Sequence, residues 1–550
     1  MQAWFRSSRF LLIFISIWLF LCSTVRYLSV PDEGRYADIS RIMYESGDWL
    51  VPRLNDLPFI HKPPLLHWIS SLLMHLFGPH VWVVRLVPVL AACAMLIGTF
   101  LFVRRYISEK VAEMSVLILS TNLLFFGSSQ YVNHDLLLAT GITLCVFCLV
   151  DFSLSRRKSM LFLGYFFGAA AFLTKGLIGI LIPGMILLPW LIYTQQFKRI
   201  PAFFNPLALI FLGVLIGPWL YSMQHQYPNF LHYFFIEQQF DRFHSEQFNN
   251  KRPWFFYLVI LCFSFLPWLM GLRVRSYKTA FSEQHISRLI QSLLFWWSVS
   301  VSVFFSIPPS KLAGYILPAI APLTIICSVW LEQSLKNTIS LTRVQKYGPA
   351  TFLIILGSVL ASTLHLIKLD FVLSSTQQFQ IILMTSMLII IPLVLLRLFN
   401  HRKIEYIHYV AGSLMILCTT IPFIVKIFDI KNNHDQLNFT QYIQPQSKIV
   451  FYENYFYDIP FMLDLKHPVY VVNDWQADQS DNSALELRDG LKFEPEQQKL
   501  LWSRQQFQNA IQQHENLIVI TSAKQFPLDQ QASQIIHNRN FNVFIFKPTQ

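Results

Sequence analysis

Residues 10–36 read FLLIFISIWLFLCSTVRYLSVPDEGRY. The first part is apolar apart from one serine, whereas the end carries Asp32, Glu33 and Arg35. An apolar block that runs on without a small-residue cleavage site is typical of a retained first membrane helix, not of a signal peptide. The stretch therefore predicts a helix over about 10–28 that leaves the bilayer just before a dense cluster of charge.

The same pattern of long apolar blocks continues along the chain. Of the 550 residues, 54% are hydrophobic and only 13% are charged, well below the ~25% charged residues of an ordinary soluble domain. Most blocks are close to the ~20 residues that cross a hydrocarbon core. We expect a polytopic α-helical membrane protein with about thirteen spans, at about 10–28, 81–103, 111–128, 135–154, 160–174, 177–194, 202–221, 254–272, 289–306, 312–331, 348–367, 379–396 and 408–428.

Basic residues between the spans predict the orientation. They occupy alternate loops, and cytoplasmic loops are the ones enriched in Lys and Arg. The rule places the N-terminus in the cytoplasm and, for an odd number of spans, the C-terminal tail outside, in the periplasm of a Gram-negative cell. It also accounts for the net charge of +12, because the basic residues form short clusters between spans. No nucleic-acid partner is therefore expected.

The chain divides into two predicted domains. Residues 1–428 form the membrane domain, which includes amphipathic surface helices at about 32–78. Residues 429–550 contain the short β-type runs KIVFY, PVYVV, NLIVIT and FNVFIF, and the stretch PEQQKLLWSRQQFQNAIQQH between the second and third runs has helical periodicity. Strands that alternate with helices predict a small α/β domain.

Cysteines give no sign of a disulfide framework. All seven lie inside apolar segments, and the polar tail has none. The CVFC motif at 145–148 stands alone in the middle of a span, where cysteines act as small buried hydrophobes.

Ionisable residues that this topology brings to the outer face are the candidates for a site. The sequence has no GxxxxGK[ST], HExxH or DxD motif. Single Lys, Arg or Tyr residues near span ends are often interfacial anchors, but cations gathered on one face favour binding of a lipid-linked phosphate. The candidates are Asp32, Glu33, Arg35, Tyr36, His61, Lys62, His134, Asp135, Lys175, Glu237, Arg242, Lys251, Lys311 and Tyr315.

Lys175 and Asp32 are the most informative candidates. Lys175 interrupts a nearly continuous apolar run, so it needs either a substrate phosphate or a carboxylate such as Asp135. Asp32 stands beside cations, where a carboxylate stays ionised and can orient or deprotonate a nucleophile. The alternative for Asp32 is that it only caps a helix beginning at Gly34.

Several motifs resemble one family of membrane enzymes. They are VPDEGRYADISRIMYESGDWLVPRLNDLPFIHKPPLLHW at 30–68, FLTKGLIG at 172–179, HYFFIEQQFDRF at 232–243, KRPWFFYL at 251–258 and SKLAGYILPAIAPL at 310–323. In this order they resemble the lipid A aminoarabinose transferases, within the wider group of polyprenyl-phosphate-sugar-dependent glycosyltransferases related to protein O-mannosyltransferases. The resemblance covers roughly residues 10–330, and beyond them it is mainly architectural.

The resemblance implies a GT-C glycosyltransferase with thirteen spans and a periplasmic α/β domain. It would act at the bacterial inner membrane, using an undecaprenyl-phosphate-linked sugar as donor and lipid A or another envelope glycolipid as acceptor, with inversion. Asp32 would match the catalytic aspartate. The residues implied to hold substrate are Glu33, Arg35, Tyr36, Lys62, Asp135, Lys175, Arg242, Lys311 and Tyr315.

Two departures from the family pattern concern a metal. The family commonly has Glu-Lys-Pro where this chain has His61-Lys62-Pro63, and a glutamine, Gln238, follows Glu237 where the family has histidine. No cofactor is therefore assigned, and His61 remains the only candidate ligand for a divalent metal such as zinc.

The residues do not decide which acceptor is used, and they leave a transporter as a second class of protein. A lipid A phosphate is already an anionic nucleophile that Asp32 would orient, whereas a protein or O-antigen hydroxyl would need Asp32 as general base. A transporter or flippase of lipid-linked sugars would also explain spans and cations, but it predicts internal repeats and charges in mid-span. The sequence shows no clear repeat.

Overall fold

The computed structural model describes residues 8–241, 251–282, 286–336, 341–366, 375–402, 404–428, 439–444, 446–475, 482–513, 515–523, 526–538 and 541–547. Their contacts define two compact units, which are described separately. The first consists of Met1–Val25, Pro88–Leu220 and Phe235–Ile427, and the second of Arg26–Val87, Tyr221–Phe234 and Phe428–Gln550.

The first unit is helical. Its helices are α1 (Ser8–Ser23), α4 (Val81–Tyr106, which begins in the second unit), α5 (Glu109–Ser120), α6 (Leu123–Ser129), α7 (His134–Ser155), α8 (Lys158–Lys175), α9 (Ile178–Tyr193), α10 (Ile200–Phe203), α11 (Pro206–Gln226, which ends in the second unit), α14 (Phe256–Leu269), α15 (Tyr277–Ala280), α16 (Arg288–Ser306), α17 (Ile320–Lys336), α18 (Arg343–Leu366), α19 (Ser375–Asn400) and α20 (Tyr406–Phe428). A π-helix, η2, spans Tyr233–Asp241, and shorter 3₁₀ turns include η1 (Phe197–Arg199), η3 (Val274–Ser276) and η4 (Ala313–Ala319).

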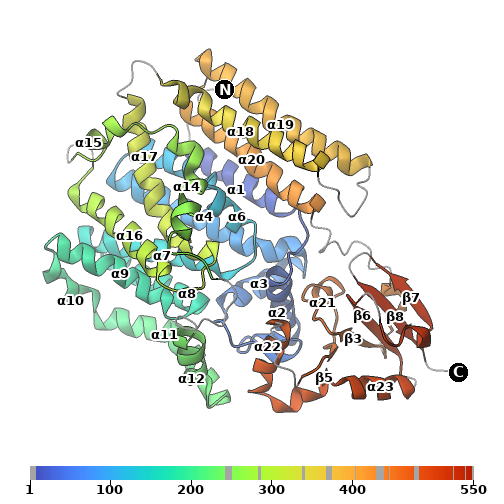
Figure 1. Ribbon diagram of the computed structural model, residues 1–550. Coiled ribbons are helices and arrows are strands. Elements are labelled where there is room, and N and C mark those ends of the chain that lie inside the picture. Colours follow the sequence, from blue (N-terminus) through green and yellow to red (C-terminus); the bar gives the residue numbers. More distant parts are fainter. Residues whose placement is uncertain are drawn as a thin grey trace. The chain divides into compact units, whose positions relative to one another are not determined.

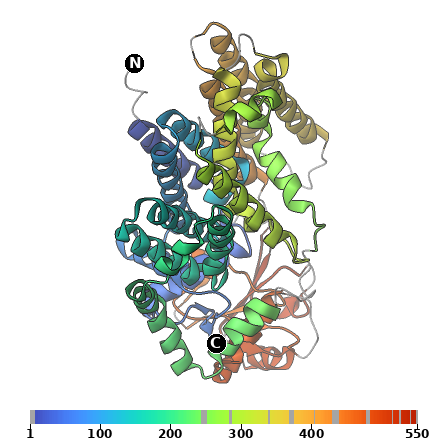
Figure 2. The ribbon, with the colours of Figure 1, turned by 90° about the vertical axis from the view of Figure 1, so that its left-hand side faces the viewer.

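Short connections make neighbouring helices of the first unit antiparallel partners. α7 packs along α8, and α18 packs along α19, a pairing that can be followed in Figures 1 and 2. Fully buried Trp190, Trp268 and Trp297 lie in the core of this unit. The seven cysteines are all free thiols, as the sequence predicted.

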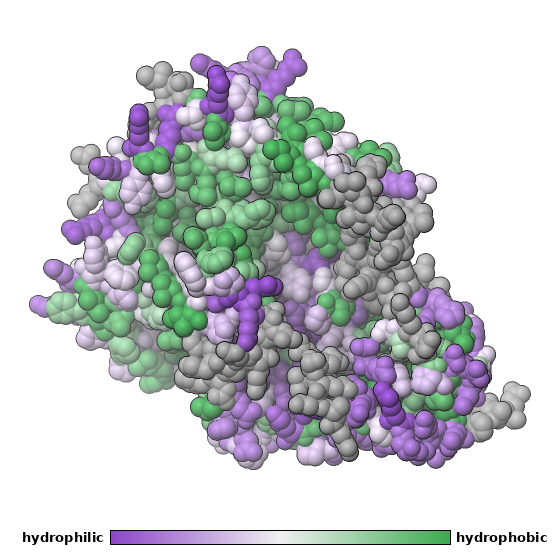
Figure 3. All heavy atoms as spheres, in the orientation of Figure 1, coloured by the Kyte–Doolittle hydropathy of each residue, from purple (hydrophilic) through white to green (hydrophobic). Residues whose placement is uncertain are grey.

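The outer surface of these helices is apolar. Figure 3 shows hydrophobic side chains gathered over the helices of the first unit, and large exposed residues include Leu207, Ile210 and Val214 on α11 and Ile382 and Ile390 on α19. In water such a surface would drive aggregation, whereas in a bilayer it contacts lipid tails. The unit is therefore built for a membrane.

The number of spans is supported only in part. Among the described residues, seven helices are long and apolar enough to cross a membrane, and two bent pairs would raise the number to nine. Helices α1 and α9 have 16 residues each, fewer than the ~20 that span a bilayer without thinning it. The expected number of about thirteen stays a prediction.

The second unit joins the first predicted surface segment to the tail. It contains α2 (Asp32–Ser46), a two-stranded hairpin of β1 (Arg53–Leu54) and β2 (Leu57–Pro58), α3 (Leu65–Phe77) and α12 (Phe230–His232). The tail adds η6 (Thr440–Tyr442), α21 (Ile459–Met462), α22 (Asn482–Leu491), η7 (Pro495–Leu500), α23 (Arg504–Gln512) and η8 (Asp529–Gln531). The sequence correctly predicted α2 and α3, but it grouped them with the spans, whereas their contacts group them with the tail.

A six-stranded mixed sheet organises the tail. Its order is β5-β4-β3-β6-β8-β7, with β3 (Lys448–Tyr452), β4 (Tyr470–Val472), β5 (Leu501–Trp502), β6 (Leu517–Thr521), β7 (Gln534–His537) and β8 (Asn542–Phe546). β3 is parallel to β4 and β6, while β8 is antiparallel to β6 and β7. The four predicted strand runs are confirmed.

The helix predicted over 495–514 is interrupted. A 3₁₀ turn covers its start, residues Leu501–Trp502 form the edge strand β5, and α23 begins only after Ser503. Ser503 and Gln506 form a capping box that fixes this start. The two apolar residues of β5 pair with β4. They also fit the helical period of the sequence, and periodicity cannot reveal that they pair with another strand.

Close contacts join α2 and the β1–β2 hairpin to the tail. A guanidinium nitrogen of Arg41 lies 2.5 Å from the backbone oxygen of Leu465. The Asn55 side chain exchanges two hydrogen bonds with the backbone of Val469, at 2.9 and 2.8 Å. A Cβ at Gly34 would lie 2.8 Å from Cβ of Asp458, so only glycine permits this approach. α22 packs against β2 and contacts α2 through the ion pair of Glu486 with Arg35, and Figure 1 shows it next to α2.

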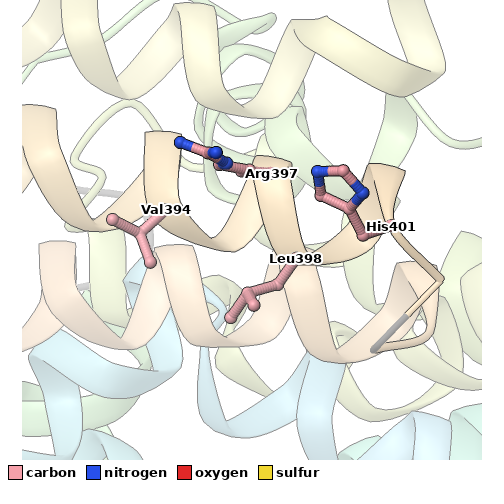
Figure 4. Close-up of a pocket in the computed structure, with 4 residues that line it drawn as sticks. All are labelled: Val394, Arg397, Leu398 and His401. Carbon is pink, nitrogen blue, oxygen red and sulfur yellow. The ribbon is translucent and has the colours of Figure 1, made fainter.

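One pocket of about 430 Å³ lies at the end of α19. Val394, Arg397, Leu398 and His401 line it from one face of the helix (Figure 4). None of them is a predicted site residue.

Candidate functional site

The start of α2 presents Asp32 and Arg35 as an ion pair. Asp32 is the first residue of α2, Pro31 holds the cap position, and Pro31 makes no side-chain cap hydrogen bond. Capping by Asp32 of a helix that starts at Gly34 is therefore wrong, although an acid in the first turn favours the helix dipole. The Asp32 side chain is 37% exposed, whereas that of Arg35 is 11% exposed. Asp32 thus offers a carboxylate to solvent while a buried cation holds it.

Arg35 has a second acidic partner from the tail. Its guanidinium forms an ion pair with Glu486 of α22 in addition to the one with Asp32. The rings of Tyr36, Phe59 and Tyr457 lie 5.1, 5.8 and 5.4 Å from the guanidinium carbon. Burial alone would lower the pKa of Arg35, but neighbouring Tyr36 and Asp32 reverse the direction and raise it. Arg35 is a permanent cation in an aromatic cage.

Glu33 is directed away from solvent into a buried network. It accepts hydrogen bonds from Arg26 at 2.5 and 2.9 Å, from Arg85 at 3.2 and 3.1 Å, and from the backbone N–H of Ser29 at 2.9 Å. Its side chain is fully buried. Burial would raise the pKa of Glu33, but Arg85 and Arg26 outweigh it and lower the pKa to about 2. The geometry gives Glu33 the role of anchoring the start of α2.

Tyr36 and Lys62 lie in the same unit as this ion pair. Tyr36 is buried, with its ring 6.0 Å from that of His67. Burial lowers the pKa of His67 to about 3, so this histidine is neutral, and its Nδ1 lies 3.0 Å from the Ser40 hydroxyl. Lys62 is half-buried in the turn before α3.

His61 contacts an acidic residue of the tail, Asp489. Its Nε2 lies 3.1 Å from Oδ2 of Asp489, whose other oxygen lies 2.8 Å from Nζ of Lys492. Burial would raise the pKa of Asp489, but His61 and Lys492 lower it to about 2. Within the described residues no three His, Cys, Asp or Glu side chains gather as a metal site. The described side chains around His61 therefore do not form a metal site.

The first unit contains the second group of predicted residues. Asp135 lies in the first turn of α7 and Lys175 in the last turn of α8. Because the two helices form an antiparallel hairpin, these ends meet, and Oδ1 of Asp135 lies 2.5 Å from Nζ of Lys175. Both side chains are 11% exposed. Of the two partners considered for Lys175, the structure provides the carboxylate, and each charge also suits the dipole of its helix end.

Tyr315 and Gly314 complete this group. The ammonium of Lys175 lies 4.0 Å from the ring centroid of Tyr315. A Cβ at Gly314 would clash with the carboxylate of Asp135, so the backbone can approach that carboxylate only as glycine. Lys311 is buried three residues earlier, and its ammonium donates to the backbone oxygens of Arg252, at 3.3 Å, and Pro308.

Arg242 lies outside the described residues. The other predicted residues fall into two sets: Asp32, Glu33, Arg35, Tyr36 and Lys62 in the second unit, and Asp135, Lys175, Lys311 and Tyr315 in the first.

Arg85, Glu486 and Asp489 contact predicted site residues or His61 but were not themselves predicted. Arg85 interrupts an apolar span just as Lys175 does, so the same reasoning about costly intramembrane charge would have selected it. Glu486 and Asp489 lie on a polar helix of the tail, where acids are ordinary and carry no signal.

The fold defines the class of protein. The described chain aligns over 97% of its length, and 97% of the other chain, with the crystal structure of ArnT from Cupriavidus metallidurans in the apo state, with a TM-score of 0.80 and 23% identity. The structure of that protein bound to undecaprenyl phosphate gives a TM-score of 0.78 at 22% identity, again over 97% of each chain. The chain is a polytopic helical membrane protein with the GT-C fold.

Sequence relatives agree with this class. Residues 61–221 match the family described as Dolichyl-phosphate-mannose-protein mannosyltransferase. The chain is 33% identical over 321 residues to the undecaprenyl phosphate-alpha-4-amino-4-deoxy-L-arabinose arabinosyl transferase of Erwinia tasmaniensis, covering 57% of each protein. The protein of that name from Edwardsiella ictaluri is 33% identical over 314 residues, 56% of each. The matched part is thus somewhat more than half of each curated relative, and the resemblance seen in the motifs is confirmed.

Proposed function

We propose that this chain is an inverting glycosyltransferase of the bacterial inner membrane that transfers 4-amino-4-deoxy-L-arabinose from undecaprenyl phosphate to a phosphate of lipid A. The catalytic residues would face the periplasm, with the N-terminus in the cytoplasm and the tail outside. The observation that carries the proposal is the partly exposed Asp32 held by the buried cation Arg35 at the start of α2. The names of the sequence relatives supply the sugar and the lipid carrier, and lipid A as acceptor rests on the resemblance of the motifs to the lipid A aminoarabinose transferases.

The chemistry assigns different tasks to acid and cation. A lipid A phosphate is already a nucleophile, so Asp32 would orient it toward the anomeric carbon without removing a proton. As the bond to the carrier breaks, negative charge grows on the departing undecaprenyl phosphate. Arg35, with Tyr36 and Lys62 from the same unit, would stabilise that charge. Stabilisation of developing charge by fixed donors commonly contributes more to the rate than any other single effect.

A protein hydroxyl is the second candidate acceptor. The family that matches residues 61–221 is described by transfer of mannose to protein, and a neutral hydroxyl would make Asp32 a general base. For either acceptor the proposed donor is an undecaprenyl-phosphate-linked sugar.

Mass spectrometry of lipid A tests the acceptor. Cells that express the chain under inducing conditions are expected to gain lipid A species heavier by one aminoarabinose on a phosphate, and cells without the gene are expected to lack them. Unchanged lipid A together with newly glycosylated envelope protein would move the assignment to the second candidate.

Lys175→Ala is expected to weaken donor binding. We propose that Lys175, held in place by Asp135, contacts the substrate phosphate together with Lys311 and Tyr315 of the first unit, with Arg242 as a further cation. Loss of one charge-assisted contact should raise the KM for the donor about tenfold, as measured with purified full-length protein.

Two variants control for a merely structural role of Lys175. Lys175→Arg keeps the charge beside Asp135 and should retain most of the affinity. Lys158→Ala, at the exposed opposite end of α8, should leave KM unaltered. Wild-type affinity of Lys175→Ala for undecaprenyl phosphate would show that the phosphate role is wrong.

A further inference from the structure

Glu486 and a phosphate would bind the same N–H donors of the Arg35 guanidinium. A guanidinium binds carboxylate and phosphate oxygens through the same fork of donors. In the structure one terminal nitrogen of Arg35 pairs with Asp32 and the other with Glu486, whereas Nε is buried without a hydrogen-bond partner among the described residues. Both terminal nitrogens therefore already hold an internal carboxylate, and the Nε–H donor has no partner among the described residues.

The tail holds Glu486 in this place. Its second oxygen accepts a hydrogen bond from the Tyr457 hydroxyl at 2.8 Å, and its side chain is only 13% exposed. Further along the same segment, Asp489 meets His61, and Glu494 forms two bonds of 2.8 Å with Arg53. Three acids of one tail segment thus contact three basic side chains of 26–87, but only Glu486 contacts a cation assigned to substrate.

The net negative charge around Arg35 opposes the binding of a phosphate. Asp32, Arg35 and Glu486 together carry a net charge of −1 when both acids are ionised, so a phosphate meets repulsion at a cation that is proposed to attract it. Binding through Arg35 requires that Glu486 leaves or that its charge is screened.

We infer that Glu486 is an internal competitor for the donor phosphate: it occupies Arg35 in the free protein and is displaced when the undecaprenyl phosphate group binds. The inference rests on the proposed function, because it takes Arg35 as a contact of that phosphate. It makes Glu486 a positioning residue that sets donor affinity and couples donor binding to the tail helix α22.

Glu486→Gln tests the inference because it removes the charge while keeping the shape and an acceptor for Tyr457. Full-length protein in detergent is titrated with undecaprenyl phosphate, and steady-state transfer is measured in parallel. We expect about fivefold tighter binding and a correspondingly lower donor KM, the size expected for one partly screened charge. Loss of a purely structural contact would not tighten binding.

Glu494→Gln is the matched control. It removes a charge from the same tail segment at the Arg53 contact, and it should leave the affinity for undecaprenyl phosphate unchanged. Unchanged or weaker binding by Glu486→Gln, with a wild-type protein that binds, would overturn the inference alone. If the wild-type protein itself does not bind undecaprenyl phosphate, the proposed function fails as well.

Discussion

Asp32→Asn is expected to abolish sugar transfer while the protein stays folded in the membrane. The change keeps the size of the side chain but removes the negative charge that orients or deprotonates the acceptor, which should cost a hundredfold or more in kcat, on the order of the 10²–10⁴ ascribed to such groups. Stability should change little, because the Asp32–Arg35 pair is partly exposed and Arg35 keeps Glu486 as a partner. The measurement is transfer by purified full-length protein, followed by mass spectrometry of the acceptor.

Asp48→Asn is the matched control for this experiment. Asp48 lies in the same unit, is 35% exposed and is 3.8 Å from Arg53, so it resembles Asp32 in exposure and pairing. It should retain full activity. Full activity of Asp32→Asn would show that the catalytic assignment is wrong.

Arg85→Met is expected to cause the largest loss of stability. Arg85 and Glu33 are both fully buried, and removal of one partner leaves a buried charge with only Arg26 to balance it. Breaking a buried pair costs about 3–5 kcal/mol, so the full-length protein in detergent should unfold at a markedly lower temperature or accumulate poorly.

Two comparisons separate this effect from a general loss of packing. Arg53→Met breaks a pair whose arginine is 16% exposed, and it should cost less. Glu33→Gln combined with Arg85→Met also removes the carboxylate that pairs with buried Arg26, so it should destabilise the protein more than Arg85→Met alone. If Arg85→Met were no more destabilising than Arg53→Met, the anchoring role of the network would be contradicted.

Acid should weaken the same network. The pKa of Glu33 falls from an ordinary 4.5 to about 2 in the folded protein. A depressed folded-state pKa contributes stability that is complete above the unfolded value and is lost as the pH falls from about 4.5 toward 2. Stability of Glu33→Gln should accordingly depend less on pH in this window.

The sequence predicted the contacts of Lys175 correctly, but it did not predict those of Glu33. Lys175 in an apolar run required a partner, and Asp135 was a correct choice because both lie at the ends of neighbouring helices. Glu33 was predicted to contact substrate beside Asp32, yet it points into the buried network, since successive residues of a helix point about 100° apart. Only the folded structure shows which of two adjacent acids lies on the buried side.

The sequence alone determined the features that depend on local pattern. Hydropathy predicted the membrane helices, periodicity predicted the surface helices and strands, and the apolar neighbours of Lys175 showed that its charge needs a partner. The tertiary structure decided which charges meet. Arg35 and Glu486 are 451 positions apart, and no local property of a polar tail helix distinguishes the acid that reaches a buried arginine from those that face water. Such pairs arise because folding brings α22 against α2, and the energy of an ion pair depends on that distance and burial, which sequence spacing does not encode.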